Sequence, residues 1–178
     1  MNGFYLATGK QGSGKTLFIT KLLYTEKDDR KIFSNYKLFG LEFEYITFDE
    51  EDENKTDILK ALRDNPHYFD NSIMLLDEIH IYFDSLDFMR KNNREMQKFF
   101  SQLRKRNILM LATTQFIYNL DVRIRRQCMN VFDMQHIYKG LFRVTTHEID
   151  GYFTEEVSRF DVDLSEYYDK YDTTELIL

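Results

Sequence analysis

Apolar and polar positions alternate along this chain with two different periods. Runs rich in β-branched, aliphatic and aromatic residues predict strands, and apolar residues spaced three and four apart predict amphipathic helices. Strands joined through helices need crossover connections, so we expect an α/β fold whose mainly parallel central sheet is covered by helices on both faces. The predicted strands are Gly3–Thr8, Lys31–Asn35, Ser72–Asp77, Ile108–Thr113 and Met129–Ile137, and the predicted helices are Lys15–Tyr24 and Asn93–Arg106.

The later part of the chain predicts a hairpin and little else that is regular. Residues 129–138 and 141–148 alternate well enough to form two antiparallel strands at the sheet edge, joined by a turn at Lys139-Gly140. The 178 residues are 43% hydrophobic and contain one proline, Pro66, so nothing marks a linker. We therefore expect a single domain over residues 1–178, with a core at about 1–150 and an acidic, tyrosine-rich extension at 151–178.

The first predicted strand is followed by a glycine-rich loop, G-K-Q-G-S-G-K-T, and then by a helix. Gly12 and Gly14 allow consecutive backbone N–H groups to converge on phosphate oxygens at the positive end of that helix. Lys15 supplies a cation for the outer phosphates, and the Thr16 hydroxyl suits Mg²⁺. The pattern is a P-loop and predicts a site for ATP and Mg²⁺. The expected nucleotide contacts are Gly9, Lys10, Gln11, Gly12, Ser13, Gly14, Lys15, Thr16 and Leu17.

Two later strands end in polar residues that would meet this loop. The strand at residues 73–76 ends in Asp77-Glu78, and in an open parallel sheet ligands bind beyond the carboxyl ends of the strands. Asp77 is therefore expected to join Thr16 as a ligand of Mg²⁺, and Glu78 to orient or deprotonate the attacking water. Gln115 ends the next strand and is a candidate sensor of the γ-phosphate. His80 is interpreted as a structural histidine.

Charge and cysteine usage limit the partners and the setting. Residues 90–126 contain ten basic and two acidic residues, although the whole chain has a net charge of −6. This segregation fits either a solvated helix face or a nucleic-acid track, and Arg90, Lys91 and Arg94 are the candidates for DNA contact. Cys128 is the single cysteine, which excludes an intrachain disulfide and favours an intracellular setting. No apolar run approaches the roughly 20 residues of a transmembrane helix, so we expect a cytoplasmic protein.

Arginines precede the strand that ends in Gln115. Arg104 and Arg106 are candidates for a guanidinium that stabilises the transferring phosphoryl group of a neighbouring subunit. That role requires a ring of subunits. The alternative is a basic helix end that compensates the helix dipole.

Together these motifs resemble the FtsK-HerA branch of the P-loop ATPases over roughly residues 3–135. The resemblance implies a ring-forming motor on DNA, a pentamer or hexamer, with Lys15, Glu78 and Gln115 as catalytic residues, Thr16 and Asp77 at the metal, and Arg104 as the best placed finger. Arg106 is the alternative finger.

Within that branch the chain resembles two small viral groups, the genome-packaging ATPases of membrane-containing viruses and the zonula-occludens-toxin-like ATPases of filamentous phage assembly. The second group typically carries a transmembrane segment after the motor domain, and this sequence contains none, which favours the packaging type. The resemblance then implies a motor that moves double-stranded DNA in the host cytoplasm or in association with the virion, and a capsid or membrane-vertex protein as partner. Two alternatives stay open: a small nucleoside or nucleotide kinase, and a nucleotide switch without translocation.

Overall fold

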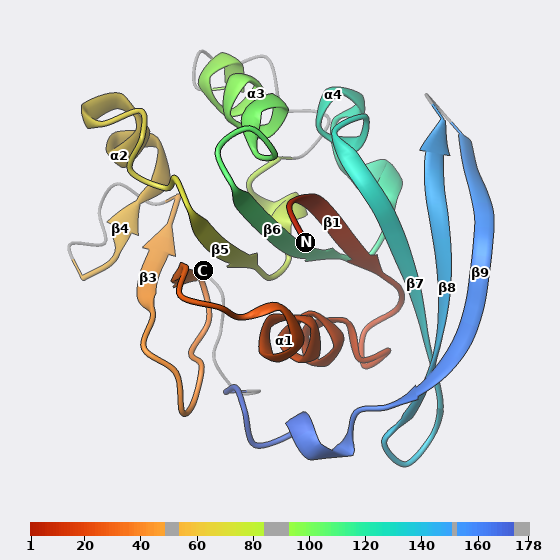
Figure 1. The fold of residues 1–178 in the computed structure, drawn as a ribbon. Helices are drawn as coiled ribbons and strands as arrows, with labels where there is room; N and C mark the ends of the chain where they lie inside the picture. The colour runs from red at the N-terminus through yellow and green to blue at the C-terminus, as the bar shows by residue number, and fades with distance from the viewer. Residues whose placement is uncertain (49–53, 84–92, 151–152, 173–178) are drawn as a thin grey trace.

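The structure is a computed structural model that describes residues 1–48, 54–83, 93–150 and 153–172, and one nine-stranded sheet organises them (Figure 1). The strand order is β4-β3-β2-β5-β6-β1-β7-β8-β9. The strands are β1 (Gly3–Thr8), β2 (Lys31–Ser34), β3 (Glu44–Thr47), β4 (Thr56–Asp57), β5 (Ser72–Leu76), β6 (Ile108–Thr114), β7 (Cys128–Tyr138), β8 (Leu141–Asp150) and β9 (Phe153–Asp163). The helices are α1 (Lys15–Glu26), α2 (Ile58–Asp64), α3 (Asn93–Gln102) and α4 (Val122–Arg125), with 3₁₀ turns η1 (Ile79–Ile81), η2 (Ile117–Asn119) and η3 (Ser165–Tyr167).

The sheet is parallel from β4 through β7 and antiparallel from β7 through β9. The expected α/β class, with its mainly parallel sheet and antiparallel C-terminal hairpin, is confirmed. Because β1, β5 and β6 run side by side in the same direction, their carboxyl ends meet at one edge of the sheet. The P-loop and both polar strand ends therefore lie at the same edge.

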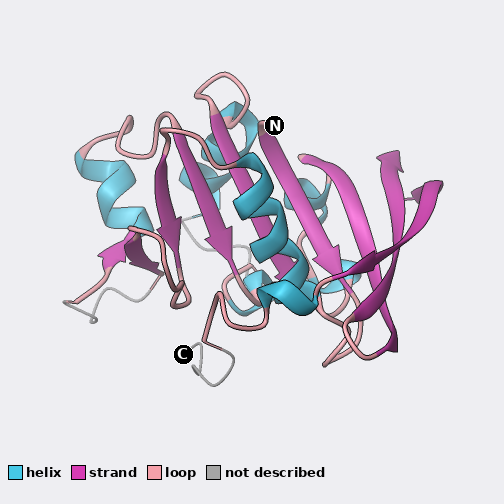
Figure 2. Ribbon diagram, turned by 60° about the horizontal axis from the view of Figure 1, so that its bottom comes forward, coloured by secondary structure: helices cyan, strands magenta, loops and turns pink. Residues whose placement is uncertain are grey.

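Helices cover both faces of the sheet, and the side chains of β1 point alternately toward the helices of one face and of the other. Phe4 and Leu6 point into a hydrophobic cluster with α2, α3 and α4, whereas Ala7 belongs to a second cluster with α1 on the other face. Figure 2 shows α1 lying over the central strands, along their direction, on that second face. Strands β5 and β6 are buried along their whole length, which is what an uninterrupted apolar run predicts for the centre of a parallel sheet. Within the described residues, no helix is both long enough and apolar enough to cross a membrane.

The structure differs from the sequence expectations at short elements and at the C-terminal side. Strands β3 and β4 and helix α2 were not predicted, because two to four strand residues carry too little alternation to be recognised. The predicted hairpin is present as β7 and β8, but β9 follows it and forms the sheet edge. Helix α3 ends at Gln102 rather than Arg106, and turns follow it over residues 103–107 as far as Asn107, which has a left-handed φ of 55°.

The segment after β9 crosses back to α1 and to the start of the β2–β3 connection. Leu164 is fully buried in the cluster around α1. The backbone N–H of Phe39 donates to the carbonyl of Lys170 at 2.8 Å, and the N–H of Asp172 donates to the carbonyl of Lys37 at 3.1 Å. The acidic, tyrosine-rich segment is thus packed on the domain as far as residue 172.

Candidate nucleotide site

The loop between β1 and α1 has the backbone conformations that its glycines allow. Gly12 and Gly14 have φ values of 75° and 86°, in the left-handed region that other residues avoid. The Ser13 N–H donates to the carbonyl of Lys10 at 3.1 Å and closes the turn, and α1 begins at Lys15. Gly14 is also confined sterically, since a Cβ there would lie 2.5 Å from Cε1 of the Phe142 ring on β8. The antiparallel hairpin thus packs directly on the P-loop.

A direct hydrogen bond joins the loop to the acidic strand end. The Thr16 hydroxyl donates to Asp77 Oδ1 at 2.9 Å. Hydroxyl and carboxylate oxygens are hard donors, and Mg²⁺ takes few protein ligands while it keeps most of its water. This pair of oxygens therefore fits the predicted metal, with Thr16 and Asp77 as the residues that would hold it.

Two neighbouring strands hold Asp77 in place. The Asn35 side chain, just beyond β2, accepts a hydrogen bond from the Asp77 N–H at 2.8 Å and donates to the Asp77 carbonyl at 3.0 Å. The Thr113 hydroxyl on β6 donates to Asp77 Oδ1 and accepts from the Glu78 N–H at 2.9 Å. Asp77 is therefore positioned through both its backbone and its carboxylate.

Both acidic side chains are held at raised pKa values. Burial raises the pKa of the Asp77 carboxyl, against the opposing hydrogen bonds from Thr113 and Thr16 and the charge of Lys15. Burial and the neighbouring Asp77 charge raise the pKa of Glu78, while Lys15 and His80 act in the other direction. Lys15 Nζ lies 3.9 Å from Glu78 Oε1, and His80 Nδ1 lies 3.2 Å from Glu78 Oε2. A carboxylate with a raised pKa is a better proton acceptor than one in water.

These groups line one end of a cavity of about 410 Å³. Lys15, Thr16, Asp77 and Glu78 form its charged end, and Asp172 adds a further carboxylate to the lining. Aromatic side chains line it elsewhere, and they come from the hairpin (His136, Phe142) and from Tyr36, Tyr168 and Tyr171. The size and the two kinds of lining suit a nucleotide, with phosphates at the charged end and apolar ring surfaces for the nucleoside.

Comparison with known proteins identifies the family. Residues 3–171 match the family model described as zonular occludens toxin (Zot). The chain belongs to the Zot family. No curated protein sequence matches the chain.

Solved structures share the fold of this Zot family member. The N-terminal domain of zonular occludens toxin from Neisseria meningitidis is 20% identical with a TM-score of 0.69, over 97% of this chain and 100% of that one. The DNA-packaging ATPase from Sulfolobus turreted icosahedral virus is 14% identical with a TM-score of 0.57, over 89% and 98% of the two chains. The genome packaging NTPase from Sulfolobus turreted icosahedral virus 2, in complex with AMPPCP, is 12% identical with a TM-score of 0.56, over 88% and 97%. The Zot-like and viral packaging resemblance is thus confirmed, and the family match is to the Zot group.

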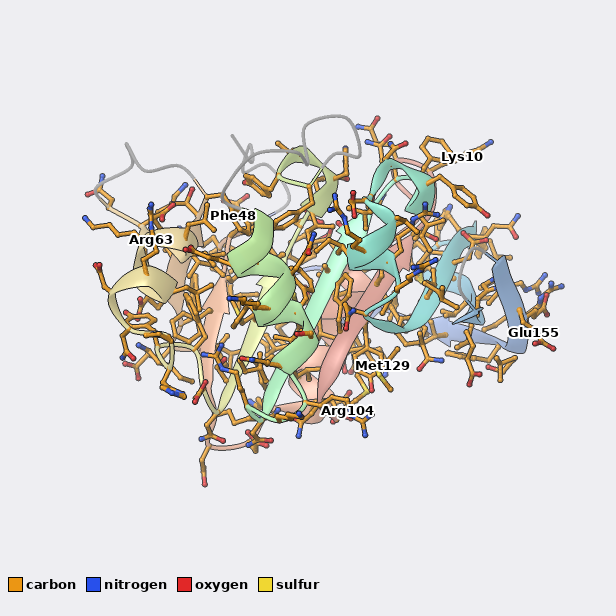
Figure 3. The ribbon with its side chains drawn as sticks, turned by 90° about the horizontal axis from the view of Figure 1, so that it is seen from above. Lys10, Phe48, Arg63, Arg104, Met129 and Glu155 are labelled. Carbon is orange, nitrogen blue, oxygen red and sulfur yellow. The ribbon has the colours of Figure 1, made fainter. Side chains whose placement is uncertain are left out.

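Gln115 and Arg104, which the sequence also predicted for the site of this Zot family member, lie outside the 410 Å³ cavity. Gln115 is at the expected strand end, where its carbonyl accepts from the Gly9 N–H at 3.4 Å. Its side chain lines a second cavity, which shares Gln11, Gly12 and His136 with the first. Arg104 is exposed at the opposite end of the strands, beside Met129 and far from Lys10 (Figure 3).

Arg106 is engaged within its own chain. Its guanidinium pairs with Asp70, donates to the Pro66 carbonyl and lies over the Phe99 ring at 5.0 Å. The geometry therefore favours Arg104 over Arg106 as a residue that could reach a neighbouring subunit. Of the DNA-contact candidates, Arg90 and Lys91 lie outside the described residues, and of Arg94 only the backbone, in the first turn of α3, is described.

Sequence reasoning missed the residues that support the site from other strands. Asn35 and Thr113 are each the last residue of a predicted strand, but polar residues are common there and gave no separate signal. Phe142 and Tyr171 reach the cavity through long-range packing that no local pattern encodes. The Tyr171 ring packs edge-on against Tyr36 at 5.8 Å, and burial, with the Asp77 charge second, raises the pKa of Tyr171 to about 12.

Proposed function

We propose that this Zot family member is an ATP-hydrolysing motor of viral or phage assembly that moves DNA as a ring of identical subunits. The observation that carries the proposal is the Thr16–Asp77 hydrogen bond of 2.9 Å, which joins the P-loop to the acidic strand end. Glu78 follows Asp77 directly and is held by Thr113, where it can act on a water molecule. A carboxylate that activates water suits hydrolysis better than transfer to a substrate hydroxyl.

The residues divide the chemistry between them. The P-loop N–H groups and Lys15 bind the phosphates, and Thr16 with Asp77 holds the metal. Mg²⁺, when bound, neutralises charge on the phosphate oxygens and aligns them. Glu78 orients the attacking water and accepts its proton, which its raised pKa favours. Gln115, tied by its backbone to the first residue of the loop, reports the state of the nucleotide to the segment that follows it.

Ring assembly would complete the site. Arg104 is exposed and lies at the end of the strands opposite the P-loop. In a head-to-tail ring that end of one subunit can face the nucleotide of the next, where a guanidinium stabilises the transferring phosphoryl group. Five or six subunits, duplex DNA as cargo, and a capsid or membrane-vertex protein that recruits the ring belong to the same proposal.

The test compares the purified chain with Glu78→Gln. The wild type is expected to hydrolyse ATP, faster with DNA present, and Glu78→Gln to bind ATP normally while its turnover falls by about 100-fold or more. Glu155→Gln, an equal change at an exposed position on β9, is the control and keeps full activity. Equal turnover in Glu78→Gln and wild type would contradict the assignment of Glu78. If the chain hydrolyses ATP at a rate that DNA does not change, the proposed motor would be contradicted, whereas the ATPase activity would stand.

A further inference from the structure

The segment directly after Gln115 exposes two aromatic rings. Phe116 and Tyr118 are 57% and 63% exposed, whereas Leu120 is fully buried and Ile117 packs against the hydrophobic cluster under α3. The 3₁₀ turn η2 is therefore anchored by its aliphatic residues and directs its aromatic ones to the surface. Two backbone hydrogen bonds fix this turn: the Asn119 N–H donates to the Phe116 carbonyl at 3.1 Å, and the Leu120 N–H donates to the Ile117 carbonyl at 3.2 Å.

Arginine accompanies these rings. The Arg125 guanidinium, from α4, lies over the Tyr118 ring at 5.1 Å, and its Nε is buried without a hydrogen-bond partner within the described structure. The nearest acidic residue in sequence, Asp121, is paired with Arg123 at 2.9 Å, and the Arg125 charge also helps to lower the pKa of its carboxyl. The surface thus combines flat apolar rings with positive charge, on a chain whose net charge is negative.

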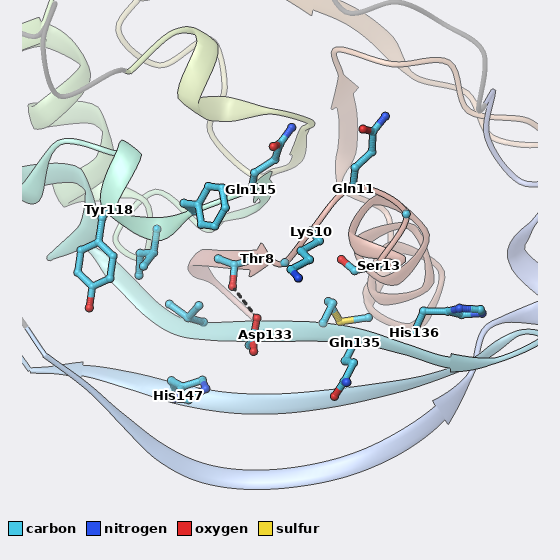
Figure 4. Close-up of a pocket in the computed structure, with 16 residues that line it drawn as sticks. Thr8, Lys10, Gln11, Ser13, Gln115, Tyr118, Asp133, Gln135, His136 and His147 are labelled. Carbon is cyan, nitrogen blue, oxygen red and sulfur yellow. Dashed lines mark hydrogen bonds between the residues drawn. The ribbon is translucent and has the colours of Figure 1, made fainter.

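A second cavity opens beside the rings. It measures about 770 Å³ and lies between the P-loop, the segment after Gln115, and strands β7 and β8 (Figure 4). Phe116, Tyr118 and Val131 give it apolar walls, and Asp133, Gln135 and His147 give it hydrogen-bonding groups. His147 Nδ1 is buried and makes no hydrogen bond among the described residues, so it is free to pair with a ligand.

We propose that Phe116, Tyr118 and Arg125 bind single-stranded polynucleotide, with bases stacked on the rings and one base turned into the second cavity. The inference rests on the proposed function, but it replaces duplex DNA as the cargo with a single strand and specifies where that strand is held. Aromatic rings bind single strands without regard to sequence, because every base has a π-face, and arginine adds both stacking and a phosphate contact. The bases of a duplex are stacked on each other and do not offer these faces. Carboxylate, amide and imidazole groups suit the hydrogen-bonding edge of a base rather than a phosphate.

The position of this surface links it to hydrolysis. The segment begins at Gln115, whose carbonyl accepts the N–H of Gly9 at the start of the P-loop. The rings lie one and three residues further on. Movement of the loop on loss of the terminal phosphate would therefore be transmitted to the bound strand through a few backbone bonds.

The test measures binding of the full chain to a fluorescently labelled oligothymidylate and to a duplex of equal length, by anisotropy and without hydrolysis. Phe116→Ala and Tyr118→Ala are each expected to raise the Kd for the single strand by roughly 5- to 100-fold, from the loss of one stacked base. The ring variants should leave the salt dependence unchanged. Arg125→Gln should reduce the slope of log K against log salt by about 0.7, the value for one phosphate contact on a single strand.

Matched controls separate the outcomes. Tyr138→Ala removes a ring that is 66% exposed at the tip of the hairpin and should bind as wild type does. Glu78→Gln should bind the strand normally although it does not turn over, so loss of the ATPase and loss of this surface are distinguishable. The proposal is overturned if Phe116→Ala and Tyr118→Ala bind the single strand like wild type, or if Tyr138→Ala weakens binding equally. Tighter binding of the duplex than of the single strand would also overturn it. So would a loss of ATP binding in the ring variants instead, because that result would assign the cavity to the nucleoside.

Crosslinking supplies a measurement that does not depend on mutant folding. Irradiation of the wild-type complex with an iododeoxyuridine oligonucleotide is expected to link the strand to Phe116 or Tyr118. Crosslinks confined to other parts of the chain would overturn the assignment.

Discussion

Replacement of Gly14 by alanine tests whether the hairpin constrains the P-loop. Gly14 has a φ of 86°, and an added methyl group would meet the Phe142 ring, with Cε1 at 2.5 Å and Cδ1 at 2.7 Å. The left-handed backbone costs alanine about 1–2 kcal/mol. Overpacking against a buried ring costs about 1–3 kcal/mol more, since Phe142 is only 3% exposed and has little room to move. We expect Gly14→Ala to lower the free energy of unfolding by about 2–5 kcal/mol in urea denaturation.

Gly12 provides the matched control. Its φ is 75°, but nothing lies within 4 Å of an added Cβ. Gly12→Ala should therefore cost only the backbone contribution of about 1–2 kcal/mol. In a Phe142→Val background, where the ring atoms that clash are absent, the cost of Gly14→Ala should fall to the same value. Equal costs for the two glycine variants in the wild-type chain, or an unchanged cost of Gly14→Ala in the Phe142→Val background, would refute the steric argument.

Three further outcomes follow from the contacts of the site and of its surroundings. Thr113→Val should lower the free energy of unfolding by about 1–3 kcal/mol, because the Glu78 N–H loses its acceptor, and should also lower the ATPase rate. Arg106→Ala should reduce the midpoint of thermal unfolding, whereas Arg104→Ala should leave it within the error of calorimetry and reduce only the ATPase rate, through the proposed ring. Arg106 and His67 hold the pKa of the Asp70 carboxyl below its usual value. The Asp70 carboxylate therefore stabilises the fold at pH values above its unfolded pKa, and this stabilisation is lost as the pH falls through its folded pKa. The difference in free energy of unfolding between wild type and Asp70→Asn should disappear when both are titrated with acid.

The sequence predicted those parts of the fold that carry a strong local pattern. The apolar runs before Gly9 and Asp77 gave the central strands to within a residue or two, and the spacing of leucines after Thr16 gave α1. Their order then placed the P-loop and Asp77 at one edge, because parallel strands end on the same side. Chain geometry alone was enough to bring Thr16 and Asp77 together.

The remainder depends on contacts between residues far apart in the sequence. In the sequence, Asn35 is only a polar residue after a short strand. Its role follows from the pairing of β2 with β5, which brings its carboxamide to the backbone of Asp77. Phe142 could be read only as one apolar position of a hairpin, and its packing on Gly14 depends on how β7 extends past the P-loop. Strand β9 was not recognised because charges interrupt its apolar positions, and pairing with β8 supplies its order instead.

Strand β9 also limits how copies of the protein can associate. It is 11 residues long and ends the sheet, with one side of its backbone unpaired within the described structure. Glu155, Glu156, Arg159 and Asp161 are exposed along it. Charged side chains along an exposed edge strand oppose its pairing with another edge, and this is one way in which proteins prevent their sheets from joining edge to edge. The proposed ring would therefore have to form through other surfaces of the domain than this edge.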